Sequence, residues 1–423
     1  MSSIIDYSAF APAAQKLLAA AKEWATVPIL GPAAYLLGVA LLRNRRIKKN
    51  IKKFNFTTRE SMAKMTDDDA WKILMDDGQL EFPFMYLKAL QFALFRTYGI
   101  PTISETLVRT GQFARPEFSM KRYADTGVLI AEFMGNAPSS ARAHEAIARM
   151  NYLHSGYRMS GKILDDDMLY TLSLFAVEPI RFINTYEWRK ASDMEVCAIG
   201  TFWKSVGDAM QISFDHLPSS KTGWKDGIHF FEELKAWSLA YEAKTMVPSK
   251  WNKDNADQTV AVLLYDFPVI MRPLARNMVL YMMDDRLREA MMYEKPNIFY
   301  KIFFASGFKL RKWFLRYLSL PRFRQYRRIS PGTDPEARHF LVNWEGAPFY
   351  IEPTFMNRWG LRAWFTWLRG MPVPGDDPKL GPNGYYIPDV GPTKFEGKGR
   401  DQLKQTRERL QVERTGQCPF FFK

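Results

Sequence analysis

The sequence predicts a mainly α-helical protein, in which a single large helical domain follows one N-terminal transmembrane helix. Three observations predict this fold class. Residues 24–42 form one uncharged, apolar stretch. The remainder has helix-capping residues and apolar residues at helical spacing, without the sustained alternation that indicates a strand. The chain of 423 residues is 47% hydrophobic and 15% aromatic, which is enough to build one large core.

The apolar stretch 24–42 is long enough to cross a hydrocarbon core of roughly 30 Å. Residues 43–53 follow it with seven basic side chains and no acid, and such a cluster is predicted to stay cytosolic. Residues 1–23 would then be a short lumenal segment, and 43–55 a basic juxtamembrane linker to a cytosolic domain. The alternatives are a buried core helix and a signal peptide. A signal peptide, however, carries its positive charges before the apolar run and needs an A-x-A-like cleavage site after it.

The main domain is expected to cover residues 56–370, because boundaries of helices recur along it. Thr66 precedes three aspartates, a pattern that caps the start of a helix, and Gly99 with Pro101 ends an apolar one. Residues 371–423, rich in Pro and Gly, are expected to form an extended tail that packs on the domain. Helices are expected from residue 66 on, over 84–98, 140–160, 165–183 and 192–212, and within 267–293.

Residues 300–318 combine aromatic side chains with five basic ones. One interpretation is an interfacial helix that dips into a bilayer, and the other is a core helix with a solvated basic edge. The net charge of +14 favours anionic partners in general. Nucleic acid is not expected among them, because no recognition motif accompanies the charge.

Several kinds of catalytic site are absent from the sequence. The H-E-x-x-H pattern fails at Ala148, and E-x-x-H occurs once, at 336–339, where a di-iron site needs two. Cys197 and Cys418 form no C-x-x-C pair. No G-x-S-x-G, phosphate loop or dinucleotide fingerprint is present. Chemistry that depends on one histidine remains, such as a haem iron held by a single proximal imidazole.

His154 is the histidine best placed for such a role. On a helix over 140–160 it shares one stripe with Ile147, Met150 and Arg158, at spacings of three and four. An imidazole among apolar neighbours, with a guanidinium one turn away, suits the edge of a haem. A buried histidine that is hydrogen-bonded to a neighbour, with Arg158 at a rim, fits the same pattern.

Two local patterns resemble a known family. R-Y-A-D-T at 122–126 is similar to the R-x-x-x-T pattern, and L-H-S-G-Y-R at 153–158 to the H-x-x-x-R pattern, of the mpaB-type ER-bound oxygenases of fungi. These share a haem-binding catalytic domain with bacterial rubber oxygenase, the latex-clearing protein. The tail that ends in C-P-F adds to the resemblance, which covers roughly residues 60–420.

The resemblance implies a role for each matched residue. His154 would be the axial ligand of a haem b iron, and Arg158 would pair with a propionate. Arg122 and Thr126 would line the distal side, where Arg122 orients dioxygen or a propionate. Glu105 is the nearest match to the family's carboxylate base, with an offset of about one residue. Asp125 stands where rubber oxygenase has a lysine.

The resemblance also implies a function. It predicts an oxidoreductase of the endoplasmic reticulum membrane, a haem b-dependent oxygenase that uses dioxygen to cleave a C=C bond in an apolar, isoprenoid-bearing intermediate of secondary metabolism. Its partners would be that small molecule, dioxygen and the bilayer through residues 24–42. The alternatives are haem-dependent hydroxylation or rearrangement of a polyketide or terpenoid, and a non-enzymatic, membrane-tethered protein that binds haem or lipid.

Overall fold

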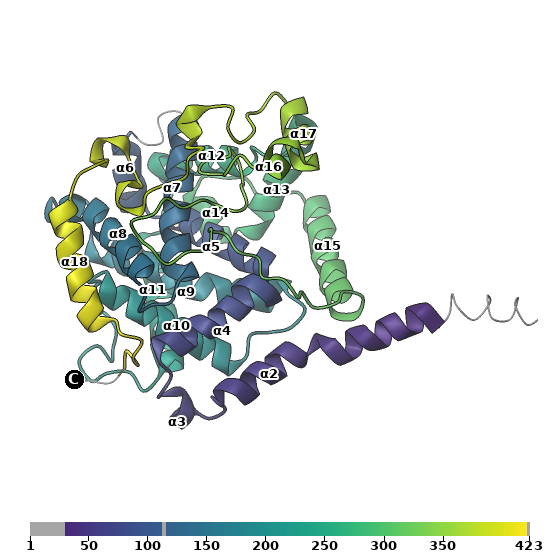
Figure 1. Cartoon of the computed structure of the whole chain (residues 1–423), viewed down its shortest axis with the longest axis horizontal. Helices are drawn as coiled ribbons and strands as arrows, with labels where there is room; N and C mark the ends of the chain where they lie inside the picture. The colour runs from purple at the N-terminus through teal and green to yellow at the C-terminus, as the bar shows by residue number, and fades with distance from the viewer. Residues whose placement is uncertain (1–29, 112–115, 421–423) are drawn as a thin grey trace, which may run out of the picture.

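Helices carry nearly all the regular structure of the computed structural model, which describes residues 30–111 and 116–420 (Figure 1). This part contains isolated β-bridges but no strand, which confirms the prediction of a mainly helical domain. The helices discussed below are α2 (Arg45–Phe54), α4 (Asp67–Asp76), α5 (Pro83–Thr97), α6 (Pro101–Arg109), α7 (Pro116–Gly135), α8 (Ala141–Met159), α9 (Asp165–Tyr186), α10 (Asp193–Ala209), α11 (Gly227–Thr245), α12 (Lys250–Leu263), η3 (Val269–Met271), α13 (Arg272–Met282), α14 (Asp285–Ala290), α15 (Ile298–Tyr317), α16 (Phe355–Trp359), α17 (Leu361–Leu368) and α18 (Arg400–Glu413).

The predicted transmembrane stretch lies partly outside the described residues. Residues 30–43 are helical and lead into α2, whereas 1–29 fall outside the described part of the chain. Among the helices that the structure describes, none is both long and apolar enough to cross a membrane. The transmembrane helix over 24–42 therefore stays a prediction.

Capping side chains set the helix starts as the sequence predicts. The Thr66 hydroxyl accepts from the Asp69 N–H at 3.0 Å and begins α4, and the Ser140 hydroxyl accepts from the Ala143 N–H at 3.3 Å and begins α8. The segment 267–293 is divided into η3, α13 and α14. The division follows from local chemistry, because Asp284 caps a new helix by accepting from the Leu287 N–H at 2.9 Å.

The core of the domain is built around α5 and α9, which pack side by side, with α10 and α11 against α9 and α4 against α10 (Figure 1). Aromatic rings fill the contacts. Phe92 of α5 lies 5.5 Å from Phe182 of α9, and Phe175 of α9 stacks on Trp203 of α10 at 5.0 Å between ring centroids. These pairs bury large apolar areas in preferred ring geometries and so hold the scaffold rigid.

The segment after residue 370 wraps back over α8, and α18 packs along that helix (Figure 1). Arg149 of α8 is fully buried and donates to the carbonyl oxygens of Val390 at 2.8 Å, Phe395 at 3.1 Å and Lys398 at 3.2 Å. Gly399 has φ +81°, and a Cβ there would lie 2.3 Å from the Tyr152 ring. One guanidinium thus binds three carbonyl groups of a segment whose own backbone hydrogen bonds are local turns.

Candidate active site

A cavity of about 700 Å³ lies inside the helical domain. Side chains of α5 to α9 and of α12 line it, and the irregular segments 325–332, 341–349 and 391–395 contribute to its wall. Its volume falls in the usual range for small-molecule sites. Much of the wall is apolar, including Leu90, Leu94, Leu129, Ile130, Leu153 and Phe175.

Three residues predicted from the sequence line this cavity together. Arg122 and Thr126 come from α7, where a spacing of four residues places them on one helix face. His154 comes from α8, which packs against α7. The two motifs at 122–126 and 153–158 therefore meet in space at the same cavity.

His154 is held as a neutral imidazole. Burial, together with the positive charges of Arg122 and Arg158, lowers the pKa of His154 to about 4. Its Nδ1 is buried and has no hydrogen-bond partner among the described residues. The residue as a whole stays partly accessible and lines the cavity. A neutral imidazole in the wall of a cavity is suited to bind a metal or a donor group.

Arg122 brings a charge into the same apolar surroundings. Burial lowers the pKa of Arg122, while Tyr98, Tyr157 and Asp125 raise it in part. An arginine stays protonated despite such a shift, because its ordinary pKa is above 12. The cavity therefore holds a cation close to the neutral ring of His154, an arrangement that favours an anionic ligand group.

Asp125 is tied to the wrapping segment. Its carboxylate accepts from Lys121 Nζ at 2.7 Å and from the Tyr350 hydroxyl at 2.6 Å, and Lys121 also donates to the Gly391 carbonyl at 3.0 Å. Burial raises the pKa of Asp125 although both partners lower it. At the position where rubber oxygenase has a lysine, this chain thus has an acid that fastens residues 350 and 391 to α7.

Two residues that the sequence assigned to the site do not line the cavity. Glu105 pairs with Arg109 at 2.7 Å, and 40% of its side chain is exposed. The next residue, Thr106, lines the cavity instead, because one step along α6 turns the side chain inward. The expectation that Glu105 is the base therefore does not match its position.

Arg158 also turns away from the cavity. Its guanidinium donates to the carbonyl oxygens of Met210 at 3.3 Å and Gln211 at 3.0 Å, and it pairs with Asp165 at 3.0 Å. These carbonyls follow the C-terminal end of α10, where the helix dipole favours a cation. Arg158 thus joins α8 to α10 and acts on His154 only through its charge.

A polar group that the sequence analysis did not identify forms another part of the wall. Gln91 Nε2 lies 2.5 Å from the Tyr123 hydroxyl, and Gln91 also donates to Glu345, which pairs with Lys88 at 3.3 Å. Gln91, Tyr123 and Glu345 line the cavity. Residues so far apart in sequence, without a motif, carried no signal that would have grouped them.

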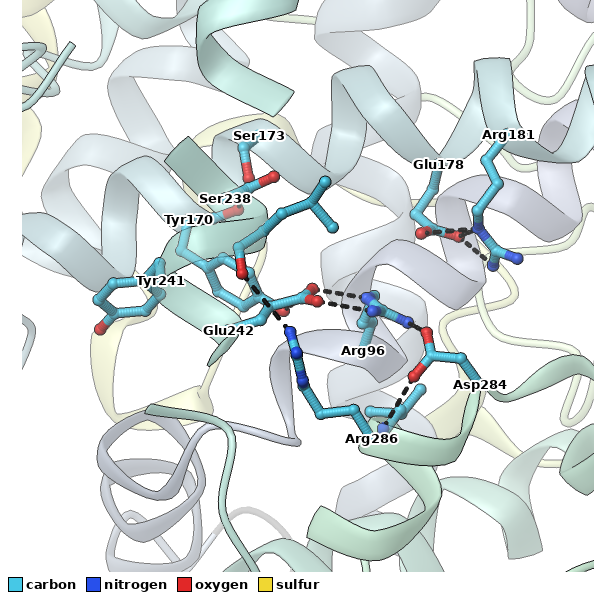
Figure 2. A network of polar contacts seen from close by, with 12 residues as sticks. Arg96, Tyr170, Ser173, Glu178, Arg181, Ser238, Tyr241, Glu242, Asp284 and Arg286 are labelled. Atoms are coloured by element: carbon cyan, nitrogen blue, oxygen red, sulfur yellow. Dashed lines mark hydrogen bonds and ion pairs between the residues drawn. The ribbon is translucent and has the colours of Figure 1, made fainter. Parts of the chain in front are cut away.

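A second buried polar network lies away from these residues (Figure 2). The Arg96 guanidinium donates to both oxygens of Glu242 at 2.7 Å and pairs with Asp284, and the Tyr170 hydroxyl donates to Glu242 at 2.8 Å. Its charges are matched by bidentate and neighbouring contacts that join α5, α9, α11 and the start of α14. We assign this network to the stability of the fold.

Comparisons with known proteins place the chain among its relatives. Residues 81–300 match the family described as "ER-bound oxygenase mpaB/B'/Rubber oxygenase, catalytic domain". The chain is 53% identical over 401 residues to "ER-bound oxygenase mpaB'" of Penicillium brevicompactum, across 94% of this chain and 95% of that relative.

Two further relatives agree. "ER-bound oxygenase mpaB" of Penicillium brevicompactum is 49% identical over 365 residues, across 86% of this chain and 87% of the relative. "ER-bound oxygenase mpaB" of Penicillium roqueforti (strain FM164) is 60% identical over 260 residues, across 62% and 87%. The matched domain includes Arg122, Thr126 and His154. The chain therefore belongs to the family of ER-bound oxygenases mpaB/B' and rubber oxygenases and carries its oxygenase catalytic domain.

Proposed function

We propose that the protein is a haem b-dependent oxygenase of the endoplasmic reticulum membrane that cleaves a C=C bond of an apolar, isoprenoid-bearing substrate. The observation that carries this proposal is the His154 imidazole, which is neutral, lacks a partner at Nδ1 and lines a largely apolar cavity of about 700 Å³. Membership in an oxygenase family supports the reaction class.

The residues of the cavity fit a haem. Among the described residues no group of three or more His, Cys, Asp or Glu side chains could hold a metal ion. The cavity provides one neutral histidine as a possible protein ligand. One is enough for a haem, because the macrocycle supplies four nitrogen ligands to the iron. The Arg122 guanidinium offers a partner for a propionate, and the apolar side chains suit the faces of the ring.

The residues of the chain would divide the work by their chemistry. When bound, haem b would supply the iron chemistry that activates dioxygen. His154 would hold the haem through a nitrogen lone pair, which is available at neutral pH because burial keeps the ring unprotonated. Arg122 stabilises negative charge in a site of low dielectric, and the Thr126 hydroxyl offers a hydrogen bond on the same face of α7.

The apolar wall and the expected reaction suit each other. Leu90, Leu94, Leu129 and Ile130 would align a hydrocarbon chain without hydrogen bonds, so its double bond can lie against the reactive centre. Cleavage of a C=C bond by dioxygen breaks that bond and forms two C=O bonds. Both oxygen atoms enter the products, so the step needs no reductant.

The absorption spectrum of the purified protein tests the cofactor and its ligand. Protein produced with a haem supply should show a Soret band, and His154→Ala should lose it or shift it. His216→Ala is the matched control, because that ring is half-exposed and pairs with Asp166 at 2.7 Å. Native protein without the band would refute the haem, and an unchanged band in His154→Ala would refute the ligand.

Isotope-labelled dioxygen tests the reaction. C=C cleavage places one labelled oxygen in each of two carbonyl fragments, which mass spectrometry resolves. Hydroxylation would leave the carbon chain whole with one labelled oxygen. Pigmented protein that converts no apolar substrate would favour a binding protein.

The orientation in the membrane has a simple test. The sequon Asn55-Phe56-Thr57 directly follows α2 and would lie just past the predicted anchor. In the proposed cytosolic orientation Asn55 is never glycosylated. A glycosidase-sensitive shift in mass that Asn55→Gln abolishes would place this domain in the lumen.

A further inference from the structure

We propose that α15 and the pair α16–α17 form a second membrane contact, separate from the predicted anchor, which inserts into the headgroup layer of a bilayer with anionic lipids. We call the exposed apolar side chains of these three helices the docking face. The proposal does not depend on the chemistry of the cavity.

The helix α15 has one face on the protein and a wide apolar face in solvent. On the inner side Phe304 is buried, and Phe308 packs against Tyr186 with 4.6 Å between ring centroids. Such large exposed side chains in one row are uncommon on a protein that meets only water. The exposed apolar side chains of α15 are Ile298, Phe299, Ile302, Phe303, Leu310, Trp313, Phe314 and Tyr317.

The pair α16–α17 repeats this arrangement. Only Ala363 and Thr366 are buried there, and the Arg362 and Arg369 side chains fix α17 to the body through the carbonyls of Trp344 and Asp266. The arginines thus anchor the helix while its apolar face stays uncovered. That face consists of Phe355, Met356, Trp359, Leu361, Trp364, Phe365, Trp367 and Leu368, of which Leu361 is 80% exposed.

The charges around the docking face identify a lipid surface as its partner. Residues 298–331 include nine basic side chains and no acid, and of these Arg311 pairs with Glu187 of the body. The three arginines of 355–371 are held by Asp376 and by carbonyls of the body, so the excess charge lies along residues 298–331. Clusters of Lys and Arg beside apolar side chains are attracted to anionic headgroups, and Trp and Tyr prefer the same interfacial layer. An apolar protein partner would not need this excess of one sign.

The N-terminal helix brings the docking face next to the predicted anchor. The Tyr35 hydroxyl donates to the Leu318 carbonyl at the end of α15 at 2.8 Å, and Arg46 of α2 donates to the Arg322 carbonyl. Figure 1 shows α15, α16 and α17 on the side of the molecule toward which the helix of residues 30–43 extends. The end of α15 therefore lies beside the predicted anchor.

Spin labels on the full chain, reconstituted in liposomes, test the proposal. The labelled variants are Phe303→Cys and Trp367→Cys. The matched control is Val412→Cys, because Val412 is also an exposed apolar residue and its helix, α18, lies on the opposite side of the molecule from α15 and α17 (Figure 1). All variants carry Cys418→Ser, because the partly accessible Cys418 would also take up the label. Cys197 is buried and is left unchanged. Collision with oxygen and with a water-soluble nickel complex reports the depth of each label, in phosphatidylcholine with and without phosphatidylserine.

The measured quantity is the ratio of accessibility to the nickel complex over accessibility to oxygen. With phosphatidylserine present, we expect this ratio to fall by at least about tenfold for the labels at 303 and 367, and to change by less than about twofold for the label at 412. Labels at 303 and 367 that stay accessible to nickel would overturn the proposal. Shielding from both reagents in detergent, or dipolar coupling between labels, would mean that a protein or a second copy covers the face and would equally overturn it. Leu361→Cys repeats the test if Trp367→Cys does not fold.

Discussion

The surroundings of His154 decide its protonation more than its own chemistry does. Burial in α8 disfavours the charged ring, and two guanidinium groups repel a proton, so the pKa of His154 falls to about 4. A histidine in water has a pKa near 6.5 and is half protonated at that pH. The fold thus keeps this imidazole neutral over the physiological range, which a metal ligand requires.

This lowered pKa predicts a dependence of stability on pH. Below pH 6.5 the unfolded chain protonates His154 and the folded chain does not, so the free energy of unfolding falls by about 3 kcal/mol between pH 7 and pH 4 through this group alone. Urea unfolding of haem-free protein at both pH values measures it. His154→Gln should remove that part of the decrease, and an equal decrease in both proteins would contradict the shift.

The positions of Glu105 and Arg122 predict different effects of substituting them, because Arg122 lines the cavity and Glu105 does not. Glu105→Gln should change product formation by less than about twofold, because its exposed pair with Arg109 contributes little. Arg122→Gln should lower it by at least about tenfold, because a charge inside the cavity is lost. The rate of product formation from an apolar substrate, measured for both variants and the native protein, tests these expectations. A larger loss in Glu105→Gln would restore Glu105 as the base.

The irregular segment over α8 depends on a single side chain for much of its order. The three carbonyl groups that Arg149 binds lie within residues 390–398, where the backbone hydrogen bonds are local turns. The same segment contributes Gly391, Pro392 and Phe395 to the cavity wall. The Arg149 guanidinium therefore contributes both to the stability of this segment and to the shape of the cavity wall.

Arg149→Met should lower the free energy of unfolding by about 3 kcal/mol, because three carbonyl groups lose the guanidinium in a buried place, although that of Phe395 still accepts from the Lys398 N–H. Urea unfolding measures the loss, and limited proteolysis should show new cleavage near residues 390–398. Arg400→Gln is the control, since its pair with Asp389 is partly exposed and should change stability by less than about 1 kcal/mol. Equal effects of both would argue against the role of Arg149.

At the scale of the whole molecule, buried ion pairs join helices that are distant in sequence. Glu242→Gln should lower the free energy of unfolding by roughly 3–5 kcal/mol, because it removes the bidentate partner of a buried Arg96 (Figure 2). Thermal and urea unfolding measure this. The absorption of the haem-loaded protein should stay the same at low temperature, since the network lies away from His154. A spectral change in the folded variant would contradict this separation.

Sequence reasoning predicted the helices that have local signals and failed where distant segments meet. Thr66 and Ser140 cap the expected helices because capping chemistry is local. The motifs of Arg122 and His154 meet because α7 and α8 are adjacent in sequence. The sequence match could not show which of Glu105 and Thr106 lines the cavity, because one residue turns a helical side chain by about 100°. The wall residue Glu345 could not be foreseen, since its contacts with Lys88 and Gln91 arise only in the folded chain.

The wrapping segment also sets an order of events during biosynthesis. His154 leaves the ribosome long before residues 391–395, which close the cavity beside it. Until those residues are made and Arg149 has captured them, the pocket is open to water on that side. A stable site for a large flat cofactor therefore forms late, after synthesis of the helical body. A nonsense codon at any position between 160 and 390 would yield a chain that retains His154 but not a closed pocket around it.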